Sequence, residues 1–137
     1  MRIFLDANIL FSAVKSDGAV HAFVAMLLDV GHKCWVDGYV VDEASRNIMA
    51  KAPGRLPYLD GLVSRVRMSA VAPAAARAEV DGLPEKDRLV LAAAVALGCD
   101  ALVTGDRTHF GKFYGRQVAG VMIHSPRSLY DHLFPHP

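Results

Sequence analysis

Cysteine is scarce in this sequence of 137 residues, and neither sign of charge is in clear excess. Its two cysteines, Cys34 and Cys99, are too few for a disulfide framework or a cysteine zinc site, so we expect buried free thiols in a reducing compartment. Fifteen basic residues against fourteen acidic ones leave a net charge of +1. No strong overall field therefore attracts nucleic acid, and a local basic patch or metal ions would have to hold a polyanion.

Long hydrophobic runs are also missing. The longest apolar stretch, Leu89 to Cys99, is well short of the roughly 20 residues that a membrane span needs. Asp6 interrupts the first apolar run, so no signal peptide is visible and we expect a soluble, cytoplasmic protein. A hydrophobic content of 53% excludes a disordered chain, and without repeats or linkers the length favours a single domain over residues 1–137.

Short apolar runs alternate with helix-length segments along the chain. Strands are predicted over Arg2 to Leu5, Lys33 to Val36, Met68 to Ala72, Ala101 to Thr104 and Val118 to His124. Helices are predicted over Ala19 to Val30, Val40 to Lys51, Leu56 to Val66, Pro84 to Gly98, and from a Ser125 cap through Leu133. This alternation indicates an α/β fold, in which helices cover both faces of a parallel sheet and ligands bind beyond the carboxyl ends of the strands.

Two of the predicted strands are followed by an aspartate. Asp6 comes directly after Arg2 to Leu5, and Asp106 follows Ala101 to Thr104 and a glycine. Either residue alone could simply start a turn or cap a helix. If the strands are parallel neighbours, both carboxylates emerge at one edge of the sheet, and this pairing favours a functional role.

The third candidate acid lies in the first turn of the helix that begins at Pro84. A favourable interaction with the helix dipole would explain Asp87, but Glu85 would serve equally well. At about 100° per residue, Asp87 lies in line with Leu91 and Ala94 and therefore on the inward side of the helix.

The fourth candidate, Glu43, borders the apolar stripe of the predicted helix from Val40 to Lys51, whereas Asp42 points further toward solvent. A carboxylate beside a buried stripe is costly unless something pairs with it. The alternative to a functional role is therefore a salt bridge, for which Arg46 and Lys51 are the candidate partners.

Four converging carboxylates repel one another and demand a cation. Mg²⁺ or Mn²⁺ suits such a site because these ions prefer carboxylate and water oxygens. No HExxH or paired His–Cys spacing offers a competing metal site, and of the six histidines we place only His109 near the cleft.

Four phrases that contain these acids resemble the PIN-domain family, the VapC-like endoribonucleases of toxin–antitoxin systems. They are Leu5-Asp-Ala-Asn-Ile-Leu10, Val41-Asp-Glu-Ala-Ser-Arg46, Glu85-Lys-Asp-Arg-Leu-Val-Leu-Ala-Ala-Ala94 and Leu102-Val-Thr-Gly-Asp-Arg-Thr-His-Phe110. The resemblance spans almost the whole chain. Some family members place another acid just beyond the last motif, where this chain has His109, so the resemblance supplies no fifth acidic ligand.

The resemblance implies a three-layer α/β/α fold whose central parallel sheet has about five strands in the order 3-2-1-4-5. It also implies metal-dependent hydrolysis of RNA, a cognate antitoxin protein and a homodimer. Residue by residue, the acids that match the family's catalytic, metal-binding quartet are Asp6, Glu43, Asp87 and Asp106. Asn8 and Thr104 match the polar positions that orient the ligands and the water.

Basic residues lie close to the acids in sequence, and we expect Arg107 and Lys112 to contact RNA phosphates. The plain alternative is that both are solvated surface residues. Tyr114 and the two phenylalanines, Phe110 and Phe113, could stack on bases, but the phenylalanines are better explained as packing a short helix after Asp106.

Two other functions compete with that of a nuclease. A phosphatase of the haloacid dehalogenase type would need Asp-x-Asp after the first strand, and Asn8 removes the second of these acids. A PIN-like module could instead bind RNA or protein without cleaving. The intact quartet argues against it, and a metal-dependent cleavage assay would decide.

Overall fold

The computed structural model describes residues 1–70 and 82–135 of the chain. The first part contains β1 (Arg2–Leu5), α1 (Ala7–Lys15), α2 (Ala19–Asp29), β2 (Lys33–Asp37), α3 (Gly38–Lys51), the 3-10 turn η1 (Pro53–Arg55), α4 (Leu56–Val63) and β3 (Arg67–Ser69). The second contains α5 (Glu85–Ala96), β4 (Ala101–Val103), α6 (Arg107–Phe110), the 3-10 turn η3 (Gly111–Phe113), β5 (Gln117–Val118), β6 (Val121–His124) and α7 (Pro126–Leu133).

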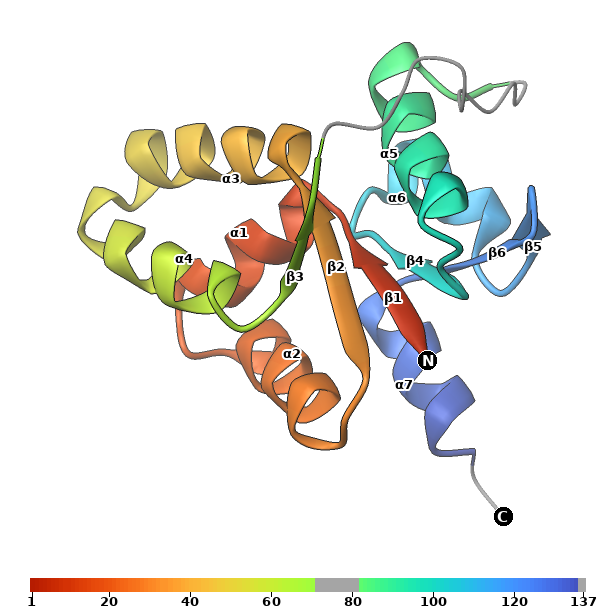
Figure 1. Ribbon diagram of the computed structural model, residues 1–137, viewed down its shortest axis with the longest axis horizontal. Coiled ribbons are helices and arrows are strands. Elements are labelled where there is room, and N and C mark those ends of the chain that lie inside the picture. The colour runs from red at the N-terminus through yellow and green to blue at the C-terminus, as the bar shows by residue number, and fades with distance from the viewer. Residues whose placement is uncertain (71–81, 136–137) are drawn as a thin grey trace.

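The sheet confirms the predicted α/β class. Its strand order is β3-β2-β1-β4-β6-β5, and every neighbouring pair is parallel except β5 and β6 (Figure 1). In the centre, Phe4 of β1 is in register with Trp35 of β2 on one side and with Leu102 of β4 on the other. The carboxyl ends of β1 and β4 therefore lie at the same edge, as the strand-end aspartates require.

The prediction of a single last strand from Val118 to His124 was wrong. The chain forms a hairpin, in which Val118 of β5 pairs with Val121 of β6. Ala119 and Gly120 make the turn between them, and both have positive φ angles, of 52° and 83°. Tight hairpins need such backbone angles, but alanine rarely adopts them, so the sequence pattern contains no strong turn signal. The result is a sixth strand, antiparallel at the edge.

Helix α1 was not among the predicted elements. It begins one residue after Asp6 and buries Ile9, Leu10 and Val14 against the sheet and its neighbours. Other boundaries differ by a few residues: the helix predicted over Leu56 to Val66 ends at Val63. The strand predicted over Met68 to Ala72 ends at Ser69, and its last two residues lie outside the described part of the chain.

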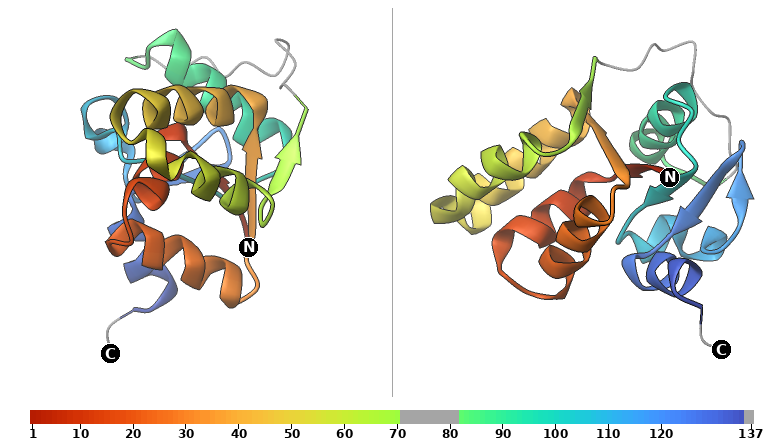
Figure 2. Two further views of the ribbon diagram at one scale, coloured as in Figure 1. Left: turned by 90° about the vertical axis from the view of Figure 1, so that its left-hand side faces the viewer. Right: turned by 60° about the horizontal axis from the view of Figure 1, so that its bottom comes forward.

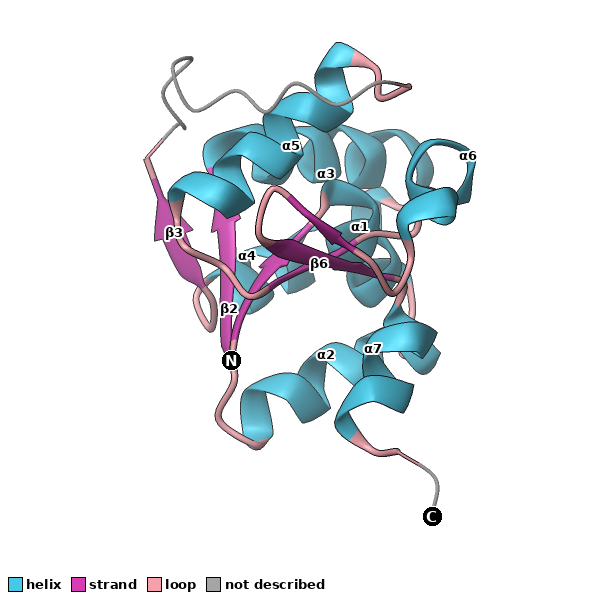
Figure 3. Ribbon diagram, turned by 90° about the vertical axis from the view of Figure 1, so that its right-hand side faces the viewer, coloured by secondary structure: helices cyan, strands magenta, loops and turns pink. Residues whose placement is uncertain are grey.

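Helices cover both faces of the sheet. Helices α1 to α4 lie on one side and α5 and α6 on the other, while α7 follows β6 and packs against α2 (Figures 2 and 3). The central strands are buried, with Phe4 and Leu102 fully covered. Both cysteines are free and buried as predicted, and burial raises the pKa of the Cys34 thiol to about 12.

Within residues 1–70 and 82–135, no single helix is long and apolar enough to cross a bilayer. Helices α1 and α2 meet the length and composition criteria only together, as a pair bent by 109°.

Candidate metal centre

Asp6 stands at the end of β1 and caps α1. Its Oδ1 accepts a hydrogen bond from the backbone N–H of Ala7 at 2.7 Å, and its Oδ2 accepts one from the Thr104 hydroxyl at 2.8 Å. The side chain is buried. Burial raises the pKa of this carboxyl to about 6, with smaller contributions from the carboxylates of Asp87 and Glu43, although the two hydrogen bonds oppose the shift. Asp6 is thus close enough to both other acids to feel their charge.

The fully buried Thr104 hydroxyl joins the ends of β1 and β4. It donates to Asp6 and accepts from the Asn8 side-chain amide at 3.3 Å and from the Asp106 backbone N–H at 3.1 Å. A hydroxyl has one hydrogen to donate and two lone pairs, so these three bonds use its full capacity. Asn8 also donates to Asp6 Oδ2 at 3.3 Å and accepts from the Gly105 backbone N–H at 2.8 Å. Both predicted polar residues therefore hold a carboxylate in place.

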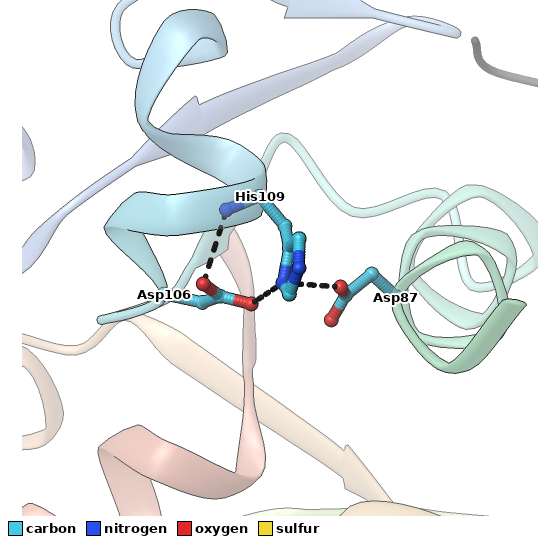
Figure 4. A group of neighbouring side chains, drawn as sticks. All are labelled: Asp87, Asp106 and His109. Atoms are coloured by element: carbon cyan, nitrogen blue, oxygen red, sulfur yellow. Dashed lines mark hydrogen bonds and ion pairs between the residues drawn. The ribbon is translucent and has the colours of Figure 1, made fainter. Parts of the chain in front are cut away.

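Asp87 and Asp106 meet across the ring of His109 (Figure 4). Asp87 is buried in the first turn of α5, and Asp106 caps α6, where its Oδ1 accepts from the His109 backbone N–H at 3.1 Å. His109 Nδ1 lies 2.7 Å from Asp106 Oδ2 and 3.2 Å from Asp87 Oδ2. One ligand atom from each of these three residues lies within 4.8 Å of the other two, and we call them the three-ligand group.

The two carboxylates of this group differ in their pKa. Burial raises the pKa of Asp87, and the nearby Asp106 charge raises it further, although His109 and Lys86 oppose the shift. Burial also acts to raise the pKa of Asp106, but hydrogen bonds from the side chain and backbone of His109 outweigh it and lower this pKa. The lowered pKa keeps Asp106 ionised, whereas the charged form of Asp87 would be stabilised by an added cation.

Glu43 lies on the inner side of α3 as predicted, with a side chain 19% exposed against 68% for Asp42. The predicted alternative partners were wrong. Arg46 pairs with Asp42 at 3.4 Å, whereas Glu43 Oε1 lies 2.5 Å from Nζ of Lys86 on α5. The hydrogen bond to Glu43 is the main cause of the raised Lys86 pKa, so this ammonium stays charged.

The structure thus brings the four predicted acids to one region but in two arrangements. Asp87 and Asp106 belong to the three-ligand group, whereas Glu43 is engaged by Lys86 and Asp6 by Thr104 and Asn8. The donors of the three-ligand group are two carboxylates and one imidazole, a set that fits a divalent ion.

The predicted RNA contacts lie on the segment that follows Asp106. Arg107 opens α6 and Lys112 lies in η3, and both residues are exposed. Lys112 Nζ lies 5.1 Å from the centroid of the Phe113 ring. Phe110 is fully buried and Phe113 packs against the core, so the phenylalanines pack the short helix after Asp106, as predicted. RNA binding by Arg107 and Lys112 stays a prediction.

Sequence reasoning missed two residues of this region. They are Lys86, which pairs with Glu43, and Asp37. Asp37 ends β2, is buried and caps α3 by accepting from the Val40 backbone N–H at 3.0 Å. An apolar strand followed by aspartate was the available signal, because Val36–Asp37 repeats the pattern of Leu5–Asp6.

Comparison with solved structures identifies the fold. One chain of "Crystal structure of VapBC2 from Rickettsia felis bound to a DNA fragment from their promoter" aligns with a TM-score of 0.65 and 15% identity, over 91% of this chain and 98% of that one. A chain of FitAcB from Neisseria gonorrhoeae gives 0.60 and 18%, over 91% and 98%. Mycobacterium tuberculosis VapC20, described as a Sarcin-Ricin loop cleaving toxin, gives 0.56 and 14%, over 80% and 94%.

The protein therefore has the fold of the VapC-type PIN-domain toxins, as the motifs predicted. No protein-family profile matches the sequence. A search of curated proteins by sequence finds no match either.

Proposed function

We propose that this protein is a metal-dependent endoribonuclease and the toxin of a type II toxin–antitoxin pair. The observation that carries this proposal is the pair of carboxylates, Asp87 and Asp106, whose facing oxygens lie beyond the strand ends of a VapC-like fold. A divalent ion such as Mg²⁺ or Mn²⁺, when bound there, neutralises the phosphodiester, activates a water and stabilises the leaving oxygen.

The chain's own residues have separate tasks in this proposal. Asp87 and Asp106 bind the ion, and Asp6 completes the negative cleft from the end of β1. Thr104 and Asn8 hold the Asp6 carboxylate in position through the hydrogen bonds described above. Glu43 adds charge from α3 and positions Lys86 by their ion pair.

Arg107 and Lys112 supply the positive charge for the RNA backbone, since both are exposed directly after the Asp106 strand end. On a chain with a net charge of only +1, such a local patch and the bound ion have to replace a general attraction for polyanions.

Two structural neighbours support the proposal of a partner protein. These neighbours are VapBC2 from Rickettsia felis, described as bound to a DNA fragment from their promoter, and VapBC-1 from Haemophilus influenzae. We propose that this chain binds an antitoxin protein, forms a homodimer and acts on RNA in the cytoplasm.

A catalytically weak or inactive PIN-like binding module is the second candidate function. The Glu43–Lys86 ion pair favours this second candidate, because the ammonium of Lys86 already neutralises one of the four acids. This candidate predicts that the protein binds RNA or a partner without cleaving it, whatever metal is added.

A cleavage assay on single-stranded RNA separates the two candidates. The wild-type chain should cleave with Mg²⁺ or Mn²⁺ and be silent in EDTA, and Asp87→Asn should be inactive because it keeps the shape but removes the charge that holds the ion. Asp42→Asn is the matched control, since Asp42 is exposed on α3 and pairs with Arg46. Cleavage that persists in Asp87→Asn, or wild-type protein that binds RNA but never cuts it, would contradict the nuclease proposal.

A further inference from the structure

The His109 side chain is the one member of the three-ligand group that is not a carboxylate (Figure 4). Its Nδ1 contacts both Asp87 Oδ2 and Asp106 Oδ2, at 3.2 and 2.7 Å. Ionised carboxylates can only accept hydrogen bonds, so Nδ1 carries the hydrogen in this arrangement. When that proton is absent, the nitrogen lone pair points the same way, toward Asp106 Oδ2, and Asp87 Oδ2 lies 3.2 Å from the same nitrogen.

The separations agree with those of ligands around a small ion. Ligands about 2.1 Å from a metal stand about 3.0–3.4 Å apart when the angle between them is a right angle or tetrahedral. The two Nδ1-to-oxygen distances of 2.7 and 3.2 Å lie close to this range. An ion that replaces the hydrogen on Nδ1 could therefore reach an oxygen of both carboxylates, since the three ligand atoms lie within 4.8 Å of one another.

The local structure keeps the imidazole in this position. His109 is the third residue of α6, and its backbone N–H donates to Asp106 Oδ1 while its ring contacts Oδ2 of the same carboxylate. The helix cap thus fixes the spacing between the carboxylate and the ring. Asp87 reaches the same ring from α5, so α5 and α6 both supply donors to one point.

We infer that His109 is a metal ligand and that its nitrogen shifts the preference of the centre from Mg²⁺ toward transition ions such as Mn²⁺ and Co²⁺. Mg²⁺ is bound almost entirely by oxygen, whereas imidazole is a good ligand for first-row transition metals. This inference rests on the metal site of the proposed function and specifies which ions that site selects.

Pulsed electron paramagnetic resonance of bound Mn²⁺ tests the inference without reference to activity. Wild-type protein should show magnetic coupling of Mn²⁺ to a nitrogen nucleus, and His109→Asp, which makes all three donors oxygen, should lose it. His21→Asp is the control: it makes the same change on α2, where His21 contacts the Ala13 carbonyl oxygen. The control should keep the nitrogen coupling.

Competition between the two ions gives the second readout. The Mg²⁺ concentration needed to displace Mn²⁺ should be about tenfold lower in His109→Asp than in wild type, because the variant no longer offers a nitrogen ligand that favours Mn²⁺. Tenfold is the lower end of the change in metal affinity that is usual when residues around a metal are replaced. A circular dichroism melt checks that each variant is folded. If His109→Asp does not fold, the nitrogen coupling in wild type and its persistence in His21→Asp still test the assignment.

The failures are distinguishable. If wild-type protein binds Mn²⁺ and cleaves RNA but shows no nitrogen coupling, His109 only pairs with the carboxylates in the metal-free protein and does not bind the ion. That result would overturn the inference but leave the proposed nuclease function intact. If wild-type protein binds neither Mn²⁺ nor Mg²⁺, the proposed metal centre fails and the inference fails with it.

Discussion

The acids beyond the strand ends form two groups, and the charge of each group is neutralised in a different way. At the ends of α5 and β4, Asp87 and Asp106 share the imidazole of His109; on α3, Glu43 is held by the ammonium of Lys86. Neutral imidazole is a common metal ligand, whereas a lysine with a raised pKa keeps its proton and cannot bind a metal. The comparison indicates that the three-ligand group is where an ion enters and that Glu43 contributes charge from a distance.

The largest expected effect separates the two groups directly. Asp106→Asn should abolish metal binding and RNA cleavage, because it removes the acid that is most firmly ionised. Glu43→Gln should lower cleavage by about 10-fold or less, within the range for residues that support a metal site without binding the ion. Isothermal titration with Mn²⁺ and a cleavage assay measure both. Equal losses in the two variants would show that Glu43 is a direct ligand and that the two groups do not differ.

The next effect concerns the Thr104 hydroxyl, which links the Asp6 carboxylate to the backbone of Asp106. Thr104→Val keeps the branched shape but removes a hydroxyl that makes three hydrogen bonds. Activity should fall by about 10–100-fold and the metal concentration for half-maximal rate should rise, because Asp6 Oδ2 loses its hydrogen bond from the Thr104 hydroxyl. A metal titration of the cleavage rate checks this, with Thr108→Val on exposed α6 as control. If Thr104→Val behaves as wild type, the hydroxyl has no part in the site.

The third prediction uses the pKa of Asp6, about 6 in the folded chain against an ordinary 3.8. As the pH falls, the Asp6 carboxylate of the folded protein therefore takes up a proton at a higher pH than the same carboxylate in the unfolded chain. Above pH 6 the buried charge destabilises the metal-free protein by up to about 3 kcal/mol, and this penalty disappears as the pH falls from about 6 to about 4.

Asp6→Asn should accordingly raise the free energy of unfolding at pH 8, by an amount that shrinks as the pH falls through this window. Urea unfolding in EDTA at several pH values measures it, with exposed Asp42→Asn as the reference. A gain that is constant with pH, or none at pH 8, would mean that the Asp6 carboxylate is not strained by burial.

The smallest effect is expected from the other group. Lys86→Gln removes the ammonium that neutralises Glu43 and should tighten Mn²⁺ binding several-fold, because the cleft becomes more negative. Lys33→Gln, at the opposite end of the strands, is the charge-matched control. Weaker Mn²⁺ binding in Lys86→Gln would show instead that the ion pair holds Glu43 where the metal needs it.

Local patterns were enough for the strand-end acids and for the inward side of α5. Asp6 and Asp106 follow short apolar runs, and Asp87 shares a helical side with the buried Leu91, so periodicity alone pointed to all three. The same reasoning missed α1, because that helix follows its strand with only the capping Asp6 between them. It also missed the hairpin, because Ala119 adopts a backbone angle that alanine seldom takes.

Local sequence patterns do not predict ion pairs between residues that are far apart in the chain. Glu43 was correctly placed beside the apolar stripe, but its nearest basic neighbours in sequence were the wrong partners. Lys86 reaches it from a helix on the other side of the undescribed segment. His109 was placed near the cleft, yet nothing in its spacing showed that one ring nitrogen would contact two carboxylates.

The α/β alternation, the core strands and the acids at strand ends can be predicted from the sequence, because these features depend on side-chain periodicity over a few residues. The cationic partner of each acid cannot be predicted in this way. The choice between His109 and Lys86 depends on how α3, α5 and α6 are positioned around the sheet, and charge pairs a few ångströms apart are fixed by that packing and not by distance along the chain.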